Sequence, residues 1–183
     1  MRNHTNTIIT GPPSSGKSTL MRQLSAYGFQ TTPEIPRLVI TKHKTNPENN
    51  TPIQKVIDTK QFQDKIKEKQ VQTESANGLY NYKKLFLDRS LIDNLAYRKF
   101  FNIGNTKEIR NEIENRLKYY NNIYYLTALE FEDDGLRVES SEQQETIGEI
   151  VKETYEEFGF SFDNSNIIEK DTIENRAQKV IQD

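Results

Sequence analysis

Thr7-Ile8-Ile9-Thr10-Gly11-Pro12-Pro13-Ser14-Ser15-Gly16-Lys17-Ser18-Thr19 is the stretch that decides the fold of this chain. Residues 11–18 match the phosphate-binding pattern G-x-x-x-x-G-K-[ST] at every fixed position. Residues 7–10 predict a buried strand that runs into the loop, and residues 18–24 predict the helix that leaves it. A strand on one side and a helix on the other are the context in which this pattern forms a binding site, which favours it over an ordinary glycine turn.

The physical chemistry of a triphosphate explains these residue types. Gly11 and Gly16 lack a Cβ, so backbone N–H groups can surround the phosphates, and the start of the helix adds positive potential. Lys17 is expected to reach the β- and γ-phosphates, and the Ser18 hydroxyl to bind Mg²⁺. We therefore expect ATP and Mg²⁺ as cofactors. The predicted nucleotide-binding residues are Gly11, Pro12, Pro13, Ser14, Ser15, Gly16, Lys17, Ser18 and Thr19, with Arg89 from a later segment.

Length and composition narrow the classes of protein. The 183 residues predict a single domain, 1–183. The net charge of −2 gives no overall attraction to nucleic acid or to an anionic membrane. The chain has no cysteine, and its two histidines lie far apart, which disfavours a zinc site. No apolar run approaches the length of a membrane span, so we expect a cytoplasmic protein.

Strand and helix patterns alternate along the chain, which predicts an α/β fold with a parallel sheet. Residues 42–52 read as a mobile polar loop, and residues 61–75 as a mostly exposed helix because its apolar stripe is thin. Ser141 with Gln144, and Asp171 with Glu174, each predict a capping box at a helix start. Strands are predicted at 7–10, 29–32, 85–88, 123–126 and 166–168, and helices at 17–27, 61–75 and 90–101, with further helices starting at about 106, 141 and 171.

Asp88 is the next informative residue, because it ends the apolar strand 85–88, and open α/β sheets bind their ligands at that edge. A carboxylate there can hold Mg²⁺ or its waters. The alternative is a helix N-cap, since a helix follows. Arg89 could pair with Asp88 or touch a phosphate.

Three further charged residues are candidates for catalysis. Arg37 and Arg137 could neutralise charge that develops during phosphoryl transfer, and Arg137 lies in a loop before a long helix, as a lid arginine would. Glu34 follows the predicted second strand and could take a proton from an acceptor hydroxyl. It could equally be a first-turn acid favoured by the helix dipole. The candidate catalytic residues are Lys17, Glu34, Asp88 and Arg137, and the candidate metal ligands are Ser18 and Asp88.

With these residues in place, the chain resembles the P-loop AAA-domain family that includes the ribosylnicotinamide-kinase half of the bifunctional NAD-biosynthesis protein NadR. The matching pieces are residues 9–20, 32–40, 86–97, 131–139 and 153–160. The resemblance implies a P-loop NTPase three-layer sandwich, with a parallel five-stranded sheet of order 2-3-1-4-5, helices on both faces and a helical lid. It also implies Glu34 as an acceptor-side base, Asp88-Arg89 as the motif before the acceptor pocket, and Arg137 as the lid arginine. The Asp88-Arg89-Ser90 run is also similar to a motif of deoxynucleoside kinases.

Two functions follow from these expectations. The first is a small-molecule kinase that passes the γ-phosphoryl group of Mg·ATP to a nucleoside or metabolite. The second is an NTP-dependent regulator that acts through a protein partner. The absence of an Asn-Lys-x-Asp motif favours ATP over GTP. The insert 41–60 has no role that the resemblance can transfer, no counterpart of the adenylyltransferase half is present, and neither the acceptor nor the oligomeric state follows from the sequence.

Overall fold

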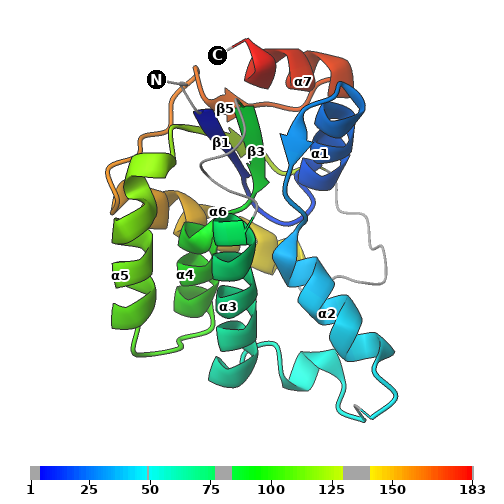
Figure 1. The fold of residues 1–183 in the computed structure, drawn as a ribbon, viewed down its shortest axis with the longest axis vertical. Coiled ribbons are helices and arrows are strands. Elements are labelled where there is room, and N and C mark those ends of the chain that lie inside the picture. Colours follow the sequence, from blue (N-terminus) through cyan, green and yellow to red (C-terminus); the bar gives the residue numbers. More distant parts are fainter. Residues whose placement is uncertain (1–4, 49, 77–83, 130–140, 183) are drawn as a thin grey trace.

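A parallel five-stranded sheet forms the centre of the molecule (Figure 1). The computed structural model describes residues 5–48, 50–76, 84–129 and 141–182. The strands follow the order β2-β3-β1-β4-β5, and all their pairings are parallel. This order confirms the predicted topology. The strands are β1 (Thr5–Thr10), β2 (Gln30–Thr31), β3 (Lys84–Asp88), β4 (Asn122–Leu126) and β5 (Ile167–Ile168).

Helices cover both faces of the sheet, as the alternation of side chains along the strands requires. On β1, Ile8 packs with α4, α5 and α6, whereas its neighbour Ile9 packs with α1 and α7. The two cores confirm the three-layer sandwich. The helices are α1 (Lys17–Ala26), α2 (Ile35–Thr45), α3 (Lys60–Ala76), α4 (Leu91–Phe100), α5 (Lys107–Arg116), α6 (Ser141–Glu156) and α7 (Ile173–Ile181), with 3₁₀ turns η1 (Ile53–Lys55) and η2 (Leu117–Tyr119).

The register of the central strands fixes where functional residues meet. Ile9 on β1 lies opposite Asp88 on β3, and the Arg89 N–H donates to the Ile9 carbonyl at 3.1 Å. The loop that follows β1 and the segment that follows β3 therefore leave the sheet side by side. This edge is the one at which parallel α/β sheets bind ligands.

Helix α2 is longer than the sequence indicated. The predicted loop 42–52 is wrong at its start, because α2 continues through Lys42, His43 and Lys44 to Thr45. Basic side chains in the last turn are favoured by the partial negative charge at a helix C-terminus. The segment then returns toward α2, where His43 Nε2 and the Thr51 carbonyl lie 2.8 Å apart.

The prediction that residues 61–75 form a mostly exposed helix is also wrong. Helix α3 buries a full face, although most of that face is polar: Phe62, Gln63, Ile66, Lys67, Gln70, Thr73 and Glu74. Several of its buried polar groups have partners. Gln70 Nε2 donates to Glu74 at 2.9 Å, and the hydroxyl of Tyr120 donates to the same carboxylate at 2.8 Å. Burial is the main reason that the pKa of Glu74 is raised to about 7.

The second predicted capping box needs correction. Thr172, and not Asp171, is the N-cap of α7, and its hydroxyl accepts from the Asn175 N–H at 3.3 Å. Helix α6 begins at Ser141 as expected, but the side chain of Gln144 donates to Ser14 Oγ at 2.8 Å. Gln144 therefore links α6 to the phosphate-binding loop.

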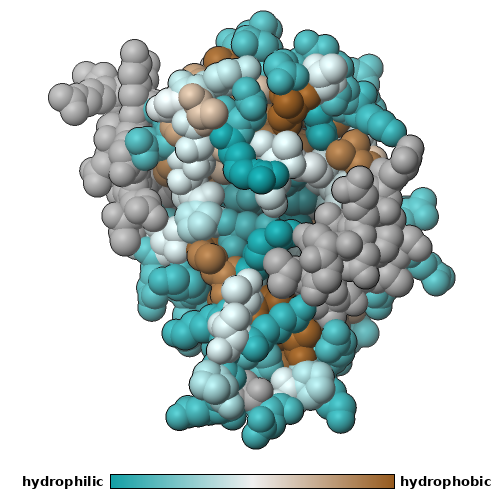
Figure 2. Space-filling view, turned by 90° about the vertical axis from the view of Figure 1, so that its right-hand side faces the viewer, coloured by the Kyte–Doolittle hydropathy of each residue, from teal (hydrophilic) through white to brown (hydrophobic). Residues whose placement is uncertain are grey.

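The surface shown in Figure 2 is largely hydrophilic, with hydrophobic side chains in small separate groups, as the 33% hydrophobic content suggests. Within the described parts of the chain, every helix is too short or too polar to cross a bilayer.

Candidate active site

The loop between β1 and α1 can form only with glycine at two positions. Gly11 has φ 138°, and a Cβ there would lie 2.3 Å from the Leu126 carbonyl oxygen. Gly16 has φ 79°, and a Cβ there would lie 2.8 Å from Arg176 Nη1. Both backbone conformations strain any residue with a side chain. The two fixed glycines of the sequence pattern are therefore required by the fold as well as by an approaching phosphate.

Lys17 is folded back onto its own loop. Its Nζ donates to the carbonyls of Gly11 at 3.0 Å and Pro12 at 2.6 Å, and to Ser15 Oγ at 2.8 Å. Burial, and next the positive charge of Arg89, lower the pKa of Lys17 to about 7. The ammonium group thus lies inside the loop, in surroundings that an anion would make more favourable.

Distant parts of the chain hold the loop in shape. Ser14 has φ 61°, and its carbonyl accepts from the Leu129 N–H at 3.0 Å. Arg176 on α7 is buried, and its Nη2 donates to the Ser15 carbonyl at 2.8 Å. Sequence reasoning missed Gln144 and Arg176. No local signal could have identified either, because their contacts with the loop span more than a hundred residues.

Asp88 is buried at the end of β3, and its Oδ1 has no hydrogen-bond partner. The N-cap alternative is wrong. Ser90 caps α4, with its hydroxyl accepting from the Ile92 N–H at 3.1 Å. Burial, and next the neighbouring charge of Glu34, raise the pKa of Asp88 to about 7. A buried carboxylate oxygen without a donor fits a cation or its water shell.

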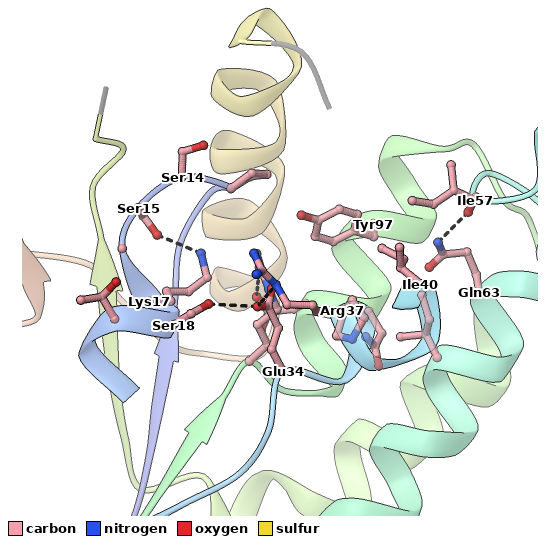
Figure 3. A pocket seen from close by; sticks show the side chains of 18 of the residues that line it. Ser14, Ser15, Lys17, Ser18, Glu34, Arg37, Ile40, Ile57, Gln63 and Tyr97 are labelled. Atoms are coloured by element: carbon pink, nitrogen blue, oxygen red, sulfur yellow. Dashed lines mark hydrogen bonds and ion pairs between the residues drawn. The ribbon is translucent and has the colours of Figure 1, made fainter. Parts of the chain in front are cut away.

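Glu34 lies between the loop and the rest of the site (Figure 3). It occupies the N-cap position of α2, but its side chain makes no capping hydrogen bond. Its Oε2 accepts from Ser18 Oγ at 3.0 Å and lies 3.2 Å from Arg37 Nε. Burial raises the pKa of Glu34, but Arg89 and Lys17 more than offset this, and the pKa is lowered below its ordinary value.

Arg89 connects several parts of the site. Its backbone has φ 65°, which turns the side chain back toward the loop. Nη1 donates to the Gly11 carbonyl at 3.2 Å and to Asp93 Oδ1 at 3.1 Å, and the guanidinium lies 5.5 Å from the centre of the Tyr97 ring. Arg89 therefore pairs with Asp93 and not directly with Asp88, as the sequence had left open.

Asp93 is a buried site residue that the sequence reasoning missed. Its carboxylate accepts from Thr10 Oγ1 at 2.6 Å, from the Tyr155 hydroxyl at 2.6 Å and from the Ser90 N–H at 2.9 Å. The Ser-x-x-Asp spacing of 90–93 is a capping-box pattern that could have identified it. Asp93 joins β1, α4 and α6 at the point where Arg89 is held.

A cavity of about 300 Å³ extends along these residues. At one end, residues 13–19 of the loop line it, together with Glu34, Arg37 and Arg89. At the other end, Figure 3 shows Ile40, Ile57, Gln63 and Tyr97. Ile57 belongs to the insert 41–60, so the insert contributes a wall of the site. We refer below to the loop end and the far end of this cavity.

The structure brings most of the predicted site residues together. Residues 13–19, Glu34 and Arg89 line the cavity, while Gly11 and Pro12 contact Lys17 through their carbonyls. Asp88 lies beside them, close enough for its charge to affect the pKa of Lys17. Arg137 and the segment predicted as a lid loop lie outside the described residues.

Ser18 and Asp88 are the residues that could hold Mg²⁺. Among the described residues, no three His, Cys, Asp or Glu side chains are grouped to bind a metal ion. Mg²⁺ bound with a nucleotide needs only one or two protein oxygens, because phosphate and water supply the rest. The hydroxyl of Ser18 and the unpartnered oxygen of Asp88 match that requirement.

The sequence belongs to the AAA-domain family whose profile matches residues 6–176. This confirms the resemblance on which the fold was predicted. No curated protein matches the chain.

Solved structures with a similar fold include kinases. NadR, solved in complex with NR, has a TM-score of 0.65 at 18% identity, and the alignment covers 98% of this chain and 51% of NadR. This chain thus spans about half the length of NadR. Deoxyadenosine kinase from M. mycoides, with products bound, has a TM-score of 0.59 at 15% identity, with 97% of each chain covered. Thymidylate kinase from Candida albicans has a TM-score of 0.53 at 15% identity, covering 98% of this chain and 90% of that kinase. At these identities the likeness establishes the fold.

Proposed function

We propose that residues 1–183 form a cytoplasmic kinase, which transfers the γ-phosphoryl group of Mg·ATP to the hydroxyl of a small molecule. One observation supports this most directly. The cavity joins a complete phosphate-binding loop to a far end with apolar walls, and the carboxylate of Glu34 lines it between Lys17 and that end. An NTPase that only hydrolyses needs room for water, whereas a kinase needs a second, shaped compartment.

At the loop end, Lys17 is the residue expected to change partners. Its ammonium donates to loop carbonyls at 2.6–3.0 Å, and the oxygens of a triphosphate are stronger, charged acceptors. The phosphates would raise the lowered pKa of Lys17, so the lysine would be positive when nucleotide is bound. Ser18 and Asp88 would hold Mg²⁺, which supplies neutralisation of phosphate charge when it is bound.

Glu34 is proposed to act on the acceptor. Its lowered pKa keeps it ionised at neutral pH, so it can accept the hydrogen bond of a hydroxyl and take its proton as the bond to phosphorus forms. As that P–O bond forms, the bond between the γ-phosphorus and the oxygen that stays with ADP breaks. Arg89 and Arg37 border the same space, where positive charge stabilises the transferring group. We place Arg137 in this group only as a proposal.

The test is a direct search for phosphoryl transfer. Purified protein with Mg·ATP is incubated with a panel of nucleosides and small hydroxylated metabolites, and ADP and the phosphorylated product are both quantified. We expect at least one acceptor to raise ATP consumption and to appear phosphorylated, and removal of Mg²⁺ with a chelator to abolish both signals. Lys17→Ala is the matched inactive control.

A failed panel would favour the regulatory alternative. If ATP is bound but no acceptor raises its consumption, the kinase proposal is contradicted. Nucleotide-dependent binding to a protein partner, measured with and without ATP, is then the informative experiment.

A further inference from the structure

Gln63 is the polar side chain at the far end of the cavity. It lies on α3 with only 2% of its surface exposed, and it lines the cavity beside Ile57 and Ile66. Its Nε2 donates to the Ile57 carbonyl at 2.8 Å, as the dashed line in Figure 3 shows. A carbonyl can only accept, so this contact fixes which way the amide faces.

The amide oxygen of Gln63 is consequently turned away from Ile57. Within the described residues, no protein donor is bonded to this oxygen, and Figure 3 shows it on the side of the amide that faces Ile40 and the cavity. The neighbouring side chains of Ile40, Ile57 and Ile66 carry no hydrogen-bonding group. A molecule in the far end that carries a donor can therefore bond to Gln63 in place of water.

Asn94 is a second amide side chain beside the cavity. Asn94 on α4 lines the cavity and is 3% exposed, and its Oδ1 is buried without a partner. Because that oxygen is itself buried, it is not open to the cavity, and the Gln63 oxygen is the one that an occupant can reach.

We propose that Gln63 selects an acceptor whose ring carries an exocyclic NH₂ donor, as part of an amino or carboxamide group, and rejects the analogue with a carbonyl or carboxylate oxygen at that place. This rests on the proposed function and names its substrate class. The apolar walls suit a flat ring, and a carbonyl there would face the Gln63 oxygen with no proton between them. The insert 41–60 has a role in this proposal, because the carbonyl of Ile57 fixes which end of the Gln63 amide faces the cavity.

Matched nucleoside pairs test the proposal without ATP. The pairs are adenosine with inosine, cytidine with uridine, and nicotinamide riboside with nicotinic acid riboside, measured by titration calorimetry. We expect the amino or carboxamide member of at least one pair to bind about 10- to 100-fold more tightly, since one good and one repulsive hydrogen-bond contact differ by this order. Equal binding within every pair, tighter binding of the carbonyl members, or no binding of any member while Mg·ATP binds, would overturn the proposal.

Two variants of Gln63 separate recognition from folding. Gln63→Met removes the acceptor oxygen. The affinities for the two members of a pair should then differ by no more than about 2-fold. Gln63→Glu keeps an acceptor oxygen in either protonation state, so the preference should persist even if affinity falls. Gln61→Met, at an exposed position of the same helix, is the control. It should change neither the affinity for nucleosides nor the preference within a pair. A preference that survives in Gln63→Met would contradict the assignment.

The proposal and the kinase function can fail separately. Selective binding without phosphoryl transfer would refute the kinase and leave the recognition by Gln63 intact. Transfer to amino and carbonyl members at equal rates would refute the recognition and leave the kinase intact.

Discussion

The phosphate-binding loop at one end of the cavity is a run of consecutive residues, 13–19, whereas the far end is assembled from α2, the insert, α3 and α4. At the loop end, polar groups already contact each other, and Lys17 is surrounded by its own loop carbonyls. At the far end, isoleucine side chains surround an amide that lacks one partner. A chemistry shared by many proteins can reside in a short contiguous motif, while the choice of substrate depends on tertiary structure.

Lys17→Ala should have the largest effect and should act on the loop end alone. We expect kcat/KM to fall by about 10³-fold, because the lysine stabilises charge that develops in the transition state. Nucleotide affinity should fall as well, while acceptor binding stays unchanged by calorimetry. Circular dichroism checks that the fold survives. Wild-type affinity for ATP in this variant would contradict the assignment of the loop.

Glu34→Gln tests the boundary between the two ends. We expect kcat to fall by about 10²-fold with little change in the KM for ATP, because the amide cannot take the acceptor proton. Steady-state kinetics with the best acceptor of the panel measure both parameters. Arg22→Gln is a control, since Arg22 is exposed and its Nη2 donates to Oγ1 of the exposed Thr19 at 3.3 Å. A large rise in the KM for ATP with unchanged kcat would place Glu34 on the nucleotide instead.

Glu74→Gln tests how the helix of the far end is held. The pKa of Glu74 is about 7 in the folded protein, above its ordinary value of 4.5, so its contribution to stability is complete below pH 4.5 and is lost as the pH rises through 7. We compare the free energy of unfolding of the wild type with that of the variant. The difference, wild type minus variant, should decrease by on the order of 2 kcal/mol between pH 5 and pH 8. Urea unfolding at both pH values measures it. Glu68→Gln, exposed on the same helix, should show no such change.

Ile57→Val should have the smallest effect and should be confined to the far end. Loss of one methyl group from the wall should raise the KM for the acceptor by about 3-fold and reduce stability by about 1 kcal/mol, leaving the KM for ATP unchanged. Ile53→Val, in the same hydrophobic cluster but not on the cavity, should reduce stability alike without changing either KM. Equal kinetic effects of both variants would mean that Ile57 does not contact the acceptor.

The same contrast explains what the sequence could predict. The loop residues and the position of Asp88 were predictable, because a fixed spacing and a strand end are local patterns. Arg176 and Gln144 were not, since each meets the loop only after the whole sheet has formed.

Residues 61–75 show why the far end of the cavity could not be predicted from the sequence. Polar side chains at helical spacing predict an exposed face, yet Gln63, Gln70 and Glu74 are all buried. Each has its partner on another segment or one turn along the helix, and such satisfaction of buried polar groups cannot be read from hydrophobicity. The roles of Glu34, Asp88 and Arg137 stay predictions.

The hydrogen bond from Arg176 to the Ser15 carbonyl has a consequence for biosynthesis. The residue that completes the first motif of the chain lies on the last described helix, some 160 residues later. A nascent polypeptide lacks this contact with the loop until α7 has been translated. The shape of the phosphate-binding loop is thus a property of the folded domain and not of the motif alone.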